Sequence, residues 1–459
     1  MIIIAGMSNT LSNVRIALLI GVAISVLCSC GASGEGEQDS QSRNETVAPP
    51  NVVIILADDI GVETVSAYGG EYATPNIDSI GENGVRFDAA HATPICTPSR
   101  VRMLTGRFNY VNYQDFAVLP QGEKTLAHHF RNAGYRTLVS GKWQLAGTKD
   151  ADDPLGTNPG DAGFDEHLVW YMQRKDKGSR FWGPKMFDGG VEHQYPETDY
   201  GPTVINDRVV DFIGRDDEKP FFVFYSMVLA HKPWVTTPIT PDAEGNKERF
   251  AGMMGYMDLM VGRVLQTLRD NGLEENTLVF FIGDNGTHPD ITTLRNGVPV
   301  RGGKWYTHDA ATHVPFLVQW PGTVTQGRPS SQLTEVLDVL PTALEAVGLE
   351  IPDSADGYSL GPVLSGDGAS GREWIFMKFD PHADYDESLS TRSRFIFDHD
   401  WKLYGDGRCY DLAADYMEEN PVDLAGRPET GCDRLAEIMA GIDAGPFFHP
   451  EPGPDLPEH

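Results

Sequence analysis

The chain has 459 residues, of which 40% are hydrophobic, so it can bury a substantial core in one large domain or in a large and a small one. Its 66 acidic and 36 basic residues give a formal net charge of -30. This excess argues against nucleic-acid binding, because a polyanion needs a basic surface. Any anionic ligand must be held by local Arg, Lys and His side chains. The same acidity would also keep a secreted protein soluble.

The N-terminal segment, residues 1–30, has the pattern of a targeting signal. Arg15 precedes an apolar run from Ile16 to Leu27 that is short for a membrane span. The following Leu27-Cys28-Ser29-Cys30-Gly31 resembles a bacterial lipobox with Cys30 as the lipidated residue, and a plain secretory signal is the alternative. Residues 31–50 are rich in Gly, Ser, Glu and Gln, which is typical of a flexible tether. We expect a periplasmic or outer-membrane lipoprotein whose lipid anchor is its only membrane contact, or otherwise a secreted protein.

Buried strands and amphipathic helices then alternate along residues 51–350. The β-branched run Asn51–Ala57 is typical of a strand buried on both faces of a parallel sheet. The alternation predicts an α/β sandwich with a large, mostly parallel central sheet in a catalytic domain. Further strands are expected at residues 136–140, 220–229, 277–282 and 314–320, and helices at residues 124–133, 202–213, 248–270 and 334–347.

Residues 351–459 follow a different pattern. Short strand candidates at residues 374–379, 393–397 and 401–404 are separated by turns. This predicts a small C-terminal antiparallel subdomain. Its two cysteines, Cys409 and Cys432, would lie in a compartment that permits disulfides, and both a pair and two separate thiols remain open.

Acidic groups follow two of the expected buried strands. Asp58 and Asp59 come directly after the first strand, and Asp284 and Asn285 follow residues 277–282. Ligands of open α/β sheets bind beyond the carboxyl ends of the strands. Three carboxylates and an amide oxygen suit Ca²⁺ or Mg²⁺ rather than Zn²⁺. The alternatives are a helix N-cap for the first pair and an ordinary Asp-Asn-Gly turn for the second.

The segment Cys96-Thr97-Pro98-Ser99-Arg100 precedes an apolar, helix-like run. A nucleophile at a helix start lies near free backbone N–H groups and the positive end of the helix dipole, and Arg100 follows one turn later. A buried, reduced cysteine is the alternative. Lys142, His231 and Lys304 also lie near strand exits, although each alone is more often a surface group.

Taken together, these motifs resemble the formylglycine-dependent (type I) sulfatases of the alkaline phosphatase-like superfamily. The resemblance runs from about Pro50 to the C-terminus, and the number and order of the motifs make it specific. Its motifs are Pro75-Asn76-Ile77-Asp78, the Cys96 segment, Leu104-Thr105-Gly106, Tyr256-Met257-Asp258, Asp284-Asn285-Gly286, Val314-Pro315, Trp320-Pro321-Gly322 and Tyr410-Asp411-Leu412.

The resemblance implies a nucleophile and a metal. Asp58, Asp59, Asp284 and Asn285 would bind a divalent cation, usually Ca²⁺, with Mg²⁺ as the alternative. A formylglycine-generating maturase would oxidise Cys96 to formylglycine (3-oxoalanine), which would complete the metal shell and attack sulfur.

The resemblance also implies how the substrate is held. Arg100 and Lys142 would stabilise the aldehyde hydrate and its sulfated form. Lys304 and His231 would hold the sulfate, with His231 as general acid for the leaving alcohol. The implied activity is hydrolysis of sulfuric esters, and a sulfated poly- or oligosaccharide is the expected substrate.

Two departures from the family pattern stand out. Gln144 occupies a substrate-binding position where the family usually has His, and an amide cannot take a proton. Another group must then serve as base, an Asp at the metal being the candidate, or turnover is slow. Residues 309–313 replace the usual Glu-Gly-Gly-x-Arg, so the loop shape is expected to differ. We expect His308 and His313 to be polar lining without a catalytic role.

Two questions stay open from the sequence alone. The segment 170–182, which contains Arg174, Lys175, Lys177 and Arg180, could line sugar subsites, and we favour a surface loop. The alternative functions are a phosphodiester or phosphonate monoester hydrolase of the same superfamily and a non-catalytic sulfoglycan-binding lipoprotein, the latter suggested by Gln144.

Overall fold

A computed structural model describes residues 48–113, 115–147, 156–170, 177–324, 326–379, 393–423 and 430–444. These residues all belong to one compact unit that begins at Ala48. The predicted signal peptide, Cys28, Cys30 and residues 31–47 of the tether lie outside the described residues. Among the described helices, none combines the length and apolar character needed to cross a bilayer.

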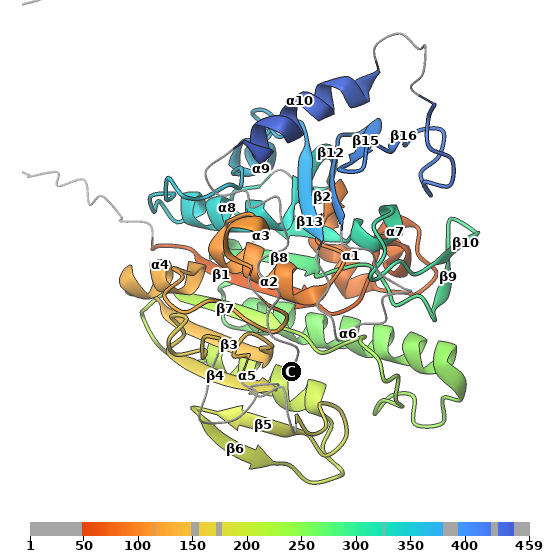
Figure 1. Cartoon of the computed structure of the whole chain (residues 1–459). Coiled ribbons are helices and arrows are strands. Elements are labelled where there is room, and N and C mark those ends of the chain that lie inside the picture. Colours follow the sequence, from red (N-terminus) through yellow and green to blue (C-terminus); the bar gives the residue numbers. More distant parts are fainter. Residues whose placement is uncertain are drawn as a thin grey trace, which may run out of the picture. The chain divides into compact units, whose positions relative to one another are not determined.

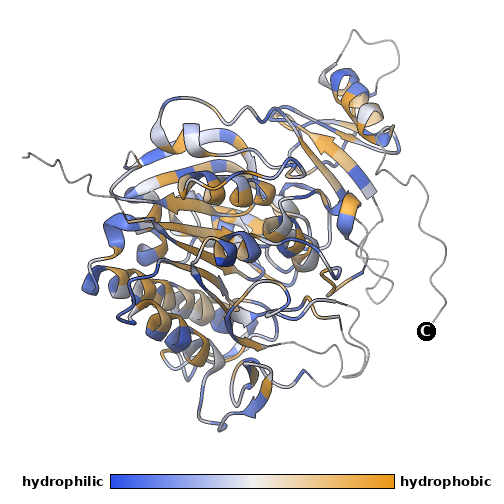
Figure 2. Cartoon of the chain, turned by 90° about the vertical axis from the view of Figure 1, so that its left-hand side faces the viewer, coloured by the Kyte–Doolittle hydropathy of each residue, from blue (hydrophilic) through white to orange (hydrophobic). Residues whose placement is uncertain are grey.

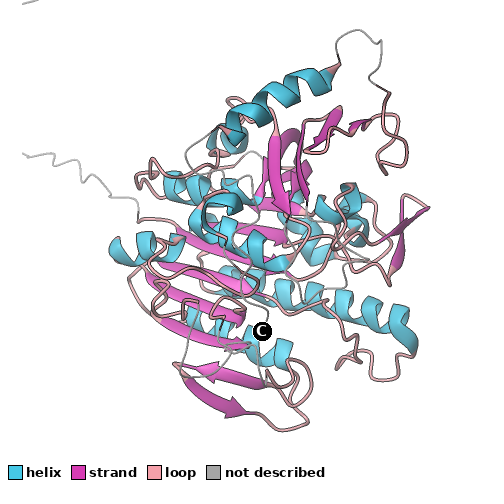
Figure 3. Cartoon of the chain, viewed as in Figure 1, coloured by secondary structure: helices cyan, strands magenta, loops and turns pink. Residues whose placement is uncertain are grey.

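A ten-stranded sheet has the strand order β12-β2-β11-β8-β1-β7-β3-β4-β5-β6. Figure 3 shows the strands in magenta with helices on either side of them. The pairs β12/β2, β8/β1, β1/β7, β7/β3 and β3/β4 are parallel, and the other four are antiparallel. The predicted mostly parallel α/β fold is confirmed. The strands are β1 (Asn51–Ala57), β2 (Gly84–His91), β3 (Arg136–Lys142), β4 (Glu166–Trp170), β5 (Lys185–Asp188), β6 (Val191–Gln194), β7 (Phe221–Ser226), β8 (Thr277–Gly283), β11 (Phe316–Gln319) and β12 (Arg328–Glu335).

The central strands are buried on both faces because helices cover both. Val53 lies opposite Val223 of β7 and Val279 of β8, and all three are inaccessible to solvent. Figure 2 shows these strands as predominantly hydrophobic. Helices α1 (Pro75–Glu82), α5 (Gly201–Ile213) and α6 (Gly245–Asp270) cover one face, and α2 (Cys96–Thr105), α4 (Leu126–Asn132) and α8 (Val339–Ala346) cover the other (Figure 1). Burying both faces explains why these strands have no polar alternation.

Short elements connect this framework. A two-stranded hairpin, β9 (Thr292–Arg295) with β10 (Val298–Arg301), follows β8. The remaining short helices are η1 (Val62–Thr64), η2 (Ser66–Tyr68), α3 (Asn109–Asn112), η3 (Glu274–Asn276), α7 (Asp309–Thr312), η4 (Val336–Asp338) and α9 (Gly361–Ser365).

A separate four-stranded antiparallel sheet lies in the C-terminal region, as predicted. It comprises β13 (Ile375–Phe379), β14 (Ser393–Phe397), β15 (Trp401–Tyr404) and β16 (Cys409–Asp411), with helix α10 (Gly431–Asp443) packed on it. A disulfide between Cys409 and Cys432 joins β16 to α10, so the two cysteines pair. The domain boundary near residue 350 stays a prediction.

Several predicted elements have different limits in the structure, in most cases by one to three residues at an end. Residues 334–347 were expected to be one helix, but Thr334 and Glu335 end β12, where they pair in parallel with Ala90 and His91. The helix α8 begins only after η4. The strand expected at residues 220–229 ends at Ser226, although the backbone N–H of Met227 still donates to the Leu56 carbonyl, and a turn follows at residues 229–230.

Candidate active site

The carboxyl ends of four neighbouring parallel strands, β8, β1, β7 and β3, form one edge of the central sheet. Asp58 and Asp59 come directly after β1, and Asp284 comes directly after β8. Lys142 is the last residue of β3. The backbone N–H of Asp59 donates to Asp284 Oδ1 at 3.1 Å, which joins two of the strand ends. The edge therefore gathers the side chains that the sequence placed at strand exits.

Helix α2 begins at Cys96, which is 1% exposed, and its first turn brings Arg100 to the same edge. The guanidinium of Arg100 donates to Asp284 Oδ2 from Nε at 3.2 Å and from Nη2 at 2.9 Å. Its Nη1 donates to the Lys142 carbonyl at 3.1 Å and to the Ser226 hydroxyl. This arrangement fixes the helix start against β3, β7 and β8.

The loop after β10 brings Lys304 into the site. Its backbone N–H donates to the Thr287 carbonyl at 3.0 Å, and its Nζ donates to Asp59 Oδ1 at 2.6 Å. A Cβ on the preceding Gly302 would come within 2.4 Å of the Thr287 carbonyl oxygen, so only glycine allows this close approach.

Two buried cations, Arg100 and Lys304, lie at the edge of the sheet where α2 begins. Burial alone would lower the pKa of Arg100 and of Lys304, yet both are raised. Asp284 raises the pKa of Arg100 and Asp59 that of Lys304, and Cys96 contributes to both. Both cations therefore remain charged at this buried edge.

Asp58 and Asp59 each meet a lysine on one oxygen only, whereas Asp284 accepts from Arg100 and from the Asp59 backbone. Lys142 Nζ lies 2.7 Å from Asp58 Oδ1, and Lys304 holds Asp59 Oδ1 together with Asn285 Nδ2, which lies 2.9 Å away. Asp58 Oδ2, Asp59 Oδ2 and Asn285 Oδ1 are buried and have no hydrogen-bond partner. Buried oxygens without a partner are costly. These oxygens are the ligands that hard divalent cations prefer, so the donor set fits such an ion.

His231 approaches the same carboxylates from the loop after β7. Its Nε2 lies 3.6 Å from Asp59 Oδ2, and its side chain is 23% exposed. Asp58, Asp59 and His231 offer possible ligand atoms within 4.8 Å of one another. The site can therefore hold a metal, with the imidazole either at the ion or beside it.

Burial and neighbouring charges separate the two adjacent aspartates. Burial raises the pKa of Asp58 to about 6, and Lys142 opposes that rise. Burial also favours a raised pKa for Asp59, but His231, Lys304 and Lys142 outweigh it and hold the pKa of Asp59 below its usual range. Asp59 is thus the stronger anionic centre of the pair.

Gln144 lies two residues after Lys142 and, like Asp58 and Asp59, has a buried side-chain oxygen without a hydrogen-bond partner. Its backbone is in the left-handed region at φ 55°, its exposure is 5%, and its Oε1 is buried without a hydrogen-bond partner. An amide held in this way can accept or donate a hydrogen bond but cannot act as a base.

Two contributors were missed or misjudged from the sequence. Ser226, the last residue of β7, donates to the Lys142 carbonyl at 2.6 Å and accepts from Arg100. The surface-loop interpretation of residues 170–182 is wrong for Arg180, which is 7% exposed and contacts His231. Its position between Trp170 and Phe181 was the available signal, because guanidinium groups stack on aromatic rings. Arg174 and Lys175 lie outside the described residues.

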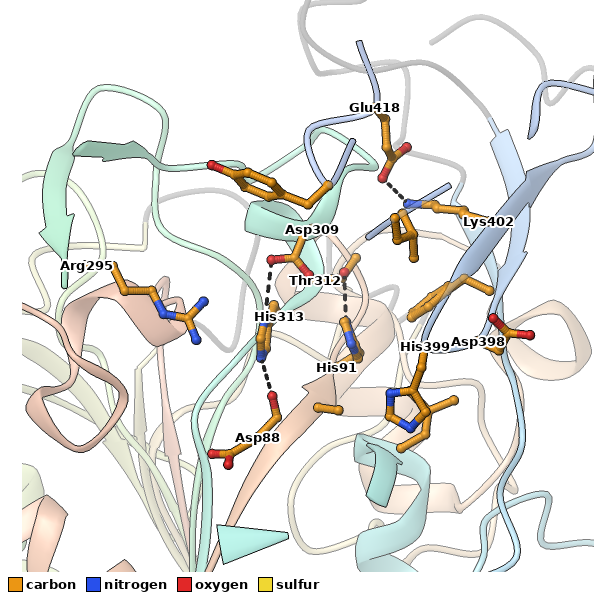
Figure 4. A pocket seen from close by; sticks show the side chains of 15 residues that line it. Asp88, His91, Arg295, Asp309, Thr312, His313, Asp398, His399, Lys402 and Glu418 are labelled. Carbon is orange, nitrogen blue, oxygen red and sulfur yellow. Dashed lines mark hydrogen bonds and ion pairs between the residues drawn. The ribbon is translucent and has the colours of Figure 1, made fainter. Parts of the chain in front are cut away.

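His313 lines a different cavity, of about 300 Å³, between the sheet edge and the C-terminal strands (Figure 4). Its ring lies 3.2 Å from Asp309 Oδ2 and 3.0 Å from the Asp88 carbonyl and stacks on His91. None of the predicted catalytic or metal-binding residues lines this cavity. The unusual segment 309–313 forms α7 and its end, and the expectation that His308 and His313 have no catalytic role stays a prediction.

Comparison with known proteins assigns the chain to a family. The sulfatase family model matches residues 50–349, and the model for the C-terminal part of N-sulphoglucosamine sulphohydrolase matches residues 303–425. Human arylsulfatase A is 30% identical over 372 residues, covering 72% of this chain and 70% of its own. The chain belongs to the sulfatase family, and it is an enzyme that hydrolyses sulfate esters.

Solved structures support the same fold. A Pseudoalteromonas sulfatase named PsFucS1 superposes with a TM-score of 0.70 at 23% identity, covering 86% of this chain and 90% of its own. A protein in complex with its substrate D-glucosamine-2-N,6-O-disulfate gives 0.69 at 21% identity, covering 86% and 97%. A phosphonate monoester hydrolase of Agrobacterium radiobacter gives 0.63 at 21% identity, covering 86% and 95%.

Proposed function

We propose that this sulfatase removes sulfate from a sulfated carbohydrate, using a formylglycine formed from Cys96 and a bound divalent cation. The observation that carries the proposal is the position of Cys96. It is buried at the start of α2, one turn before Arg100, which contacts Asp284 at the sheet edge where Lys304 holds Asp59 and three buried oxygens lack partners. The hydrated aldehyde would supply the oxygen that attacks sulfur.

Asp58, Asp59 and Asn285 would hold the cation through their open oxygens, with Asp284 as a further ligand. Ca²⁺ is the ion we favour and Mg²⁺ is the alternative, because all of the donor atoms are oxygens. When bound, the ion would act as a Lewis acid on a sulfate oxygen.

The charge balance supports an anionic substrate. Asp58, Asp59 and Asp284 are offset by Arg100, Lys142 and Lys304, so the buried groups sum to about zero without an ion. A divalent cation would leave an excess of positive charge in a site of low dielectric, which would attract a sulfate ester monoanion.

The side chains around the ion would bind the sulfate group and protonate the leaving oxygen. Lys304 and Lys142 would hold sulfate oxygens, and Gln144 would add a hydrogen bond through its buried amide. As the bond between sulfur and the ester oxygen breaks, that oxygen keeps the electron pair and takes a proton from His231 Nε2. The attacking hydroxyl of the hydrate would give its proton to an Asp at the metal, which passes it on to the released sulfate. The second hydroxyl would return a proton to His231 as the bond between its carbon and the sulfate oxygen breaks, which frees sulfate and re-forms the aldehyde. Water then adds to the aldehyde, so one water is consumed for each alcohol and hydrogen sulfate formed.

The carbohydrate class is supported by a structural neighbour that binds a disulfated glucosamine. A phosphoryl ester is the second candidate substrate. The structural neighbour that hydrolyses phosphonate monoesters has the same fold, and one fold can support both reactions.

We also propose a route to the cell envelope. The enzyme would be exported, its Cys30 lipidated, and its Cys96 oxidised by a formylglycine-generating maturase. A Cys30→Ser variant is then expected to leave the membrane fraction while its specific activity is kept. Retention of this variant in the membrane would contradict the anchor.

The test is a desulfation screen of defined sulfated oligosaccharides with protein produced alongside the maturase. We expect sulfate release from at least one sugar, weaker hydrolysis of aryl phosphodiesters, and loss of both in Cys96→Ala. A preference for phosphodiesters would select the second candidate. Sugar binding without release of sulfate would favour the non-catalytic alternative, and activity retained by Cys96→Ala would overturn the nucleophile.

A further inference from the structure

A cavity of about 300 Å³ lies beside α7, and none of the described residues assigned to the reaction lines it. Its walls come from β2, β9, α7 and β12 and from strands and loops of the C-terminal sheet (Figure 4). This volume is at the lower end of the range of small-molecule sites and accommodates about one sugar unit. The cavity therefore has the size of a binding site that the desulfation reaction itself does not use.

Two basic side chains of the lining are engaged by the protein. Lys402 Nζ lies 2.7 Å from Glu418 Oε1 and also donates to the Thr307 carbonyl. On the opposite wall, His313 Nδ1 lies 3.2 Å from Asp309 Oδ2. The protein itself thus supplies anionic partners for both of these groups.

Arg295 of β9 differs from these two residues. Its Nε donates to the Tyr68 carbonyl at 3.2 Å, and no carboxylate in the described part of the chain forms an ion pair with its guanidinium. Its backbone is fixed by an antiparallel bridge to Gly70. Figure 4 shows the guanidinium directed toward His313 from the side of the cavity opposite Lys402. A guanidinium fork matches the paired oxygens of a carboxylate or a sulfate, so Arg295 suits an anionic group in the cavity.

Aromatic rings form another part of the lining. The ring of His91 stacks on that of His313, and Phe397 meets His91 edge-on with 4.8 Å between the ring centres. Tyr416, which also lines the cavity, is 53% exposed. A tyrosine ring offers an apolar face to a ligand while its hydroxyl stays in water. Sugar rings have apolar faces of their own, so these rings and Arg295 together suit an anionic sugar.

The cavity is close to the catalytic groups along the chain. His91 precedes Cys96 by five residues, and Asp309 follows Lys304 by five residues. Even a fully extended segment of this length spans no more than about 18 Å. A carbohydrate of a few units can therefore occupy the catalytic site and the cavity at the same time.

We propose that this cavity is a second carbohydrate-binding site in which Arg295 binds a sulfate or carboxylate group of a sugar unit that is not itself desulfated. The inference rests on the proposed function, because it specifies which further part of a sulfated carbohydrate the enzyme recognises. No bond is made or broken in the cavity. The site adds affinity for a chain of sugars and fixes the position of that chain relative to Cys96.

Equilibrium binding tests the site without turnover. Titration calorimetry with the Ca²⁺-loaded Cys96→Ala chain would use three hexasaccharides: a sulfated galactan without carboxylates, a polygalacturonate without sulfates, and neutral maltohexaose. Adding Arg295→Gln should weaken binding of at least one anionic sugar about tenfold, because a charge-assisted hydrogen-bonded pair is lost. The sugar that responds identifies the anionic group, and any binding of maltohexaose should not depend on Arg295.

Two further variants separate ligand binding from an effect on folding. Tyr416→Ala removes a largely exposed ring and should weaken binding of the same sugar about threefold. Arg208→Gln, the control, removes an arginine of α5 that pairs with Asp188 and should leave binding unchanged. Thermal unfolding of each variant reports its folded state, and Tyr416→Ala decides the question if Arg295→Gln does not fold.

Kinetics of the formylglycine-containing enzyme give a second readout. With the anionic oligosaccharide that it desulfates, Arg295→Gln should raise KM about tenfold and leave kcat unchanged, because the lost contact acts equally on the bound substrate and the transition state. With a small aryl sulfate, which does not reach the cavity, both constants should stay as in the wild type.

The outcomes distinguish failure of the inference from failure of the proposed function. The inference is overturned if neither anionic hexasaccharide binds, if both bind Arg295→Gln as tightly as the parent, or if maltohexaose loses affinity equally. If Arg295→Gln weakens binding of an anionic sugar but the wild type hydrolyses no sulfate ester, the proposed function fails while the second site stands.

Discussion

Two clusters of buried charged side chains in this molecule contain similar residues. They differ in whether a cationic side chain faces every carboxylate oxygen. Near the C-terminal sheet, Arg102 and Arg372 meet Glu335 and Asp338. Each of the four carboxylate oxygens there faces a guanidinium nitrogen, including a 2.6 Å contact from Arg372 to Glu335. Three of these oxygens accept hydrogen bonds, and Glu335 Oε1, which has no hydrogen-bond partner, is paired with Arg372 as an ion pair.

At the carboxyl edge of the sheet, lysines replace arginines beside Asp58 and Asp59. An ammonium is a compact donor that meets one oxygen, whereas a guanidinium fork covers two. The second oxygen of each aspartate is therefore buried and without a partner. The choice of cation therefore distinguishes a structural ion cluster from one that can receive a ligand.

The largest effect on stability is expected from removing a carboxylate that pairs with Arg102 and Arg372. Glu335→Ala leaves Arg102 and Arg372 buried together and should lower the free energy of unfolding by roughly 3–5 kcal/mol. Denaturant titration measures this change. Glu373→Ala, which removes a 72%-exposed partner of Arg434, should change stability by less than about 1 kcal/mol. Equal effects of the two variants would show that the cluster does not stabilise the fold.

Substitutions in the cluster of Asp58, Asp59 and their two lysines should affect activity more than stability. Asp59→Asn keeps the shape but removes the charge, and we expect kcat/KM to fall about 100–1000-fold together with Ca²⁺ affinity. Asp207→Asn, on the exposed face of α5, is the control and should retain both. If Asp59→Asn binds Ca²⁺ like the wild type, the open oxygens are not the metal site.

Replacing Lys142 by arginine would give the Asp58 carboxylate the kind of cation that pairs with Glu335 and Asp338. In Lys142→Arg the guanidinium fork should cover the open oxygen of Asp58, so Ca²⁺ affinity should fall about tenfold while the protein stays folded. Lys247→Arg, at a 60%-exposed site paired with Glu71, should have no such effect. Titration calorimetry with EDTA-stripped protein measures both, and tighter Ca²⁺ binding by Lys142→Arg would refute the role given to the lysine.

The smallest effect is expected at Gln144. Gln144→His offers a base of similar size at a buried position with an open acceptor, so activity on small aryl sulfates should hold or rise by less than about tenfold. Initial rates at saturating substrate provide the measurement. A collapse of activity would instead mean that the amide has a dedicated function in this enzyme.

Much of the fold followed from the sequence because the buried strands are continuous apolar runs. Asn51–Ala57 and the antiparallel strands at residues 393–397 and 401–404 have the predicted limits. The strands β2 and β12 were missed because they are partly exposed and carry polar residues such as Arg86 and Gln332. Their pairing is decided by tertiary contacts that local patterns do not contain.

The candidate site was predictable where chemistry follows a strand end. Asp58 and Asp284 are adjacent to buried strands that end at the same sheet edge, so periodicity alone brought them together. Arg180 comes from an irregular segment whose path depends on stacking with Trp170. Which oxygens remain open also depends on side-chain geometry, and no spacing in the sequence encodes it.

The proposed nucleophile is tested most directly by the chemical state of residue 96. Mass spectrometry of the peptide that contains it, from natively produced enzyme active on a sulfate ester, should find an aldehyde in place of the thiol. An unmodified cysteine in the active protein would contradict the proposed nucleophile and the role given to the charges around it.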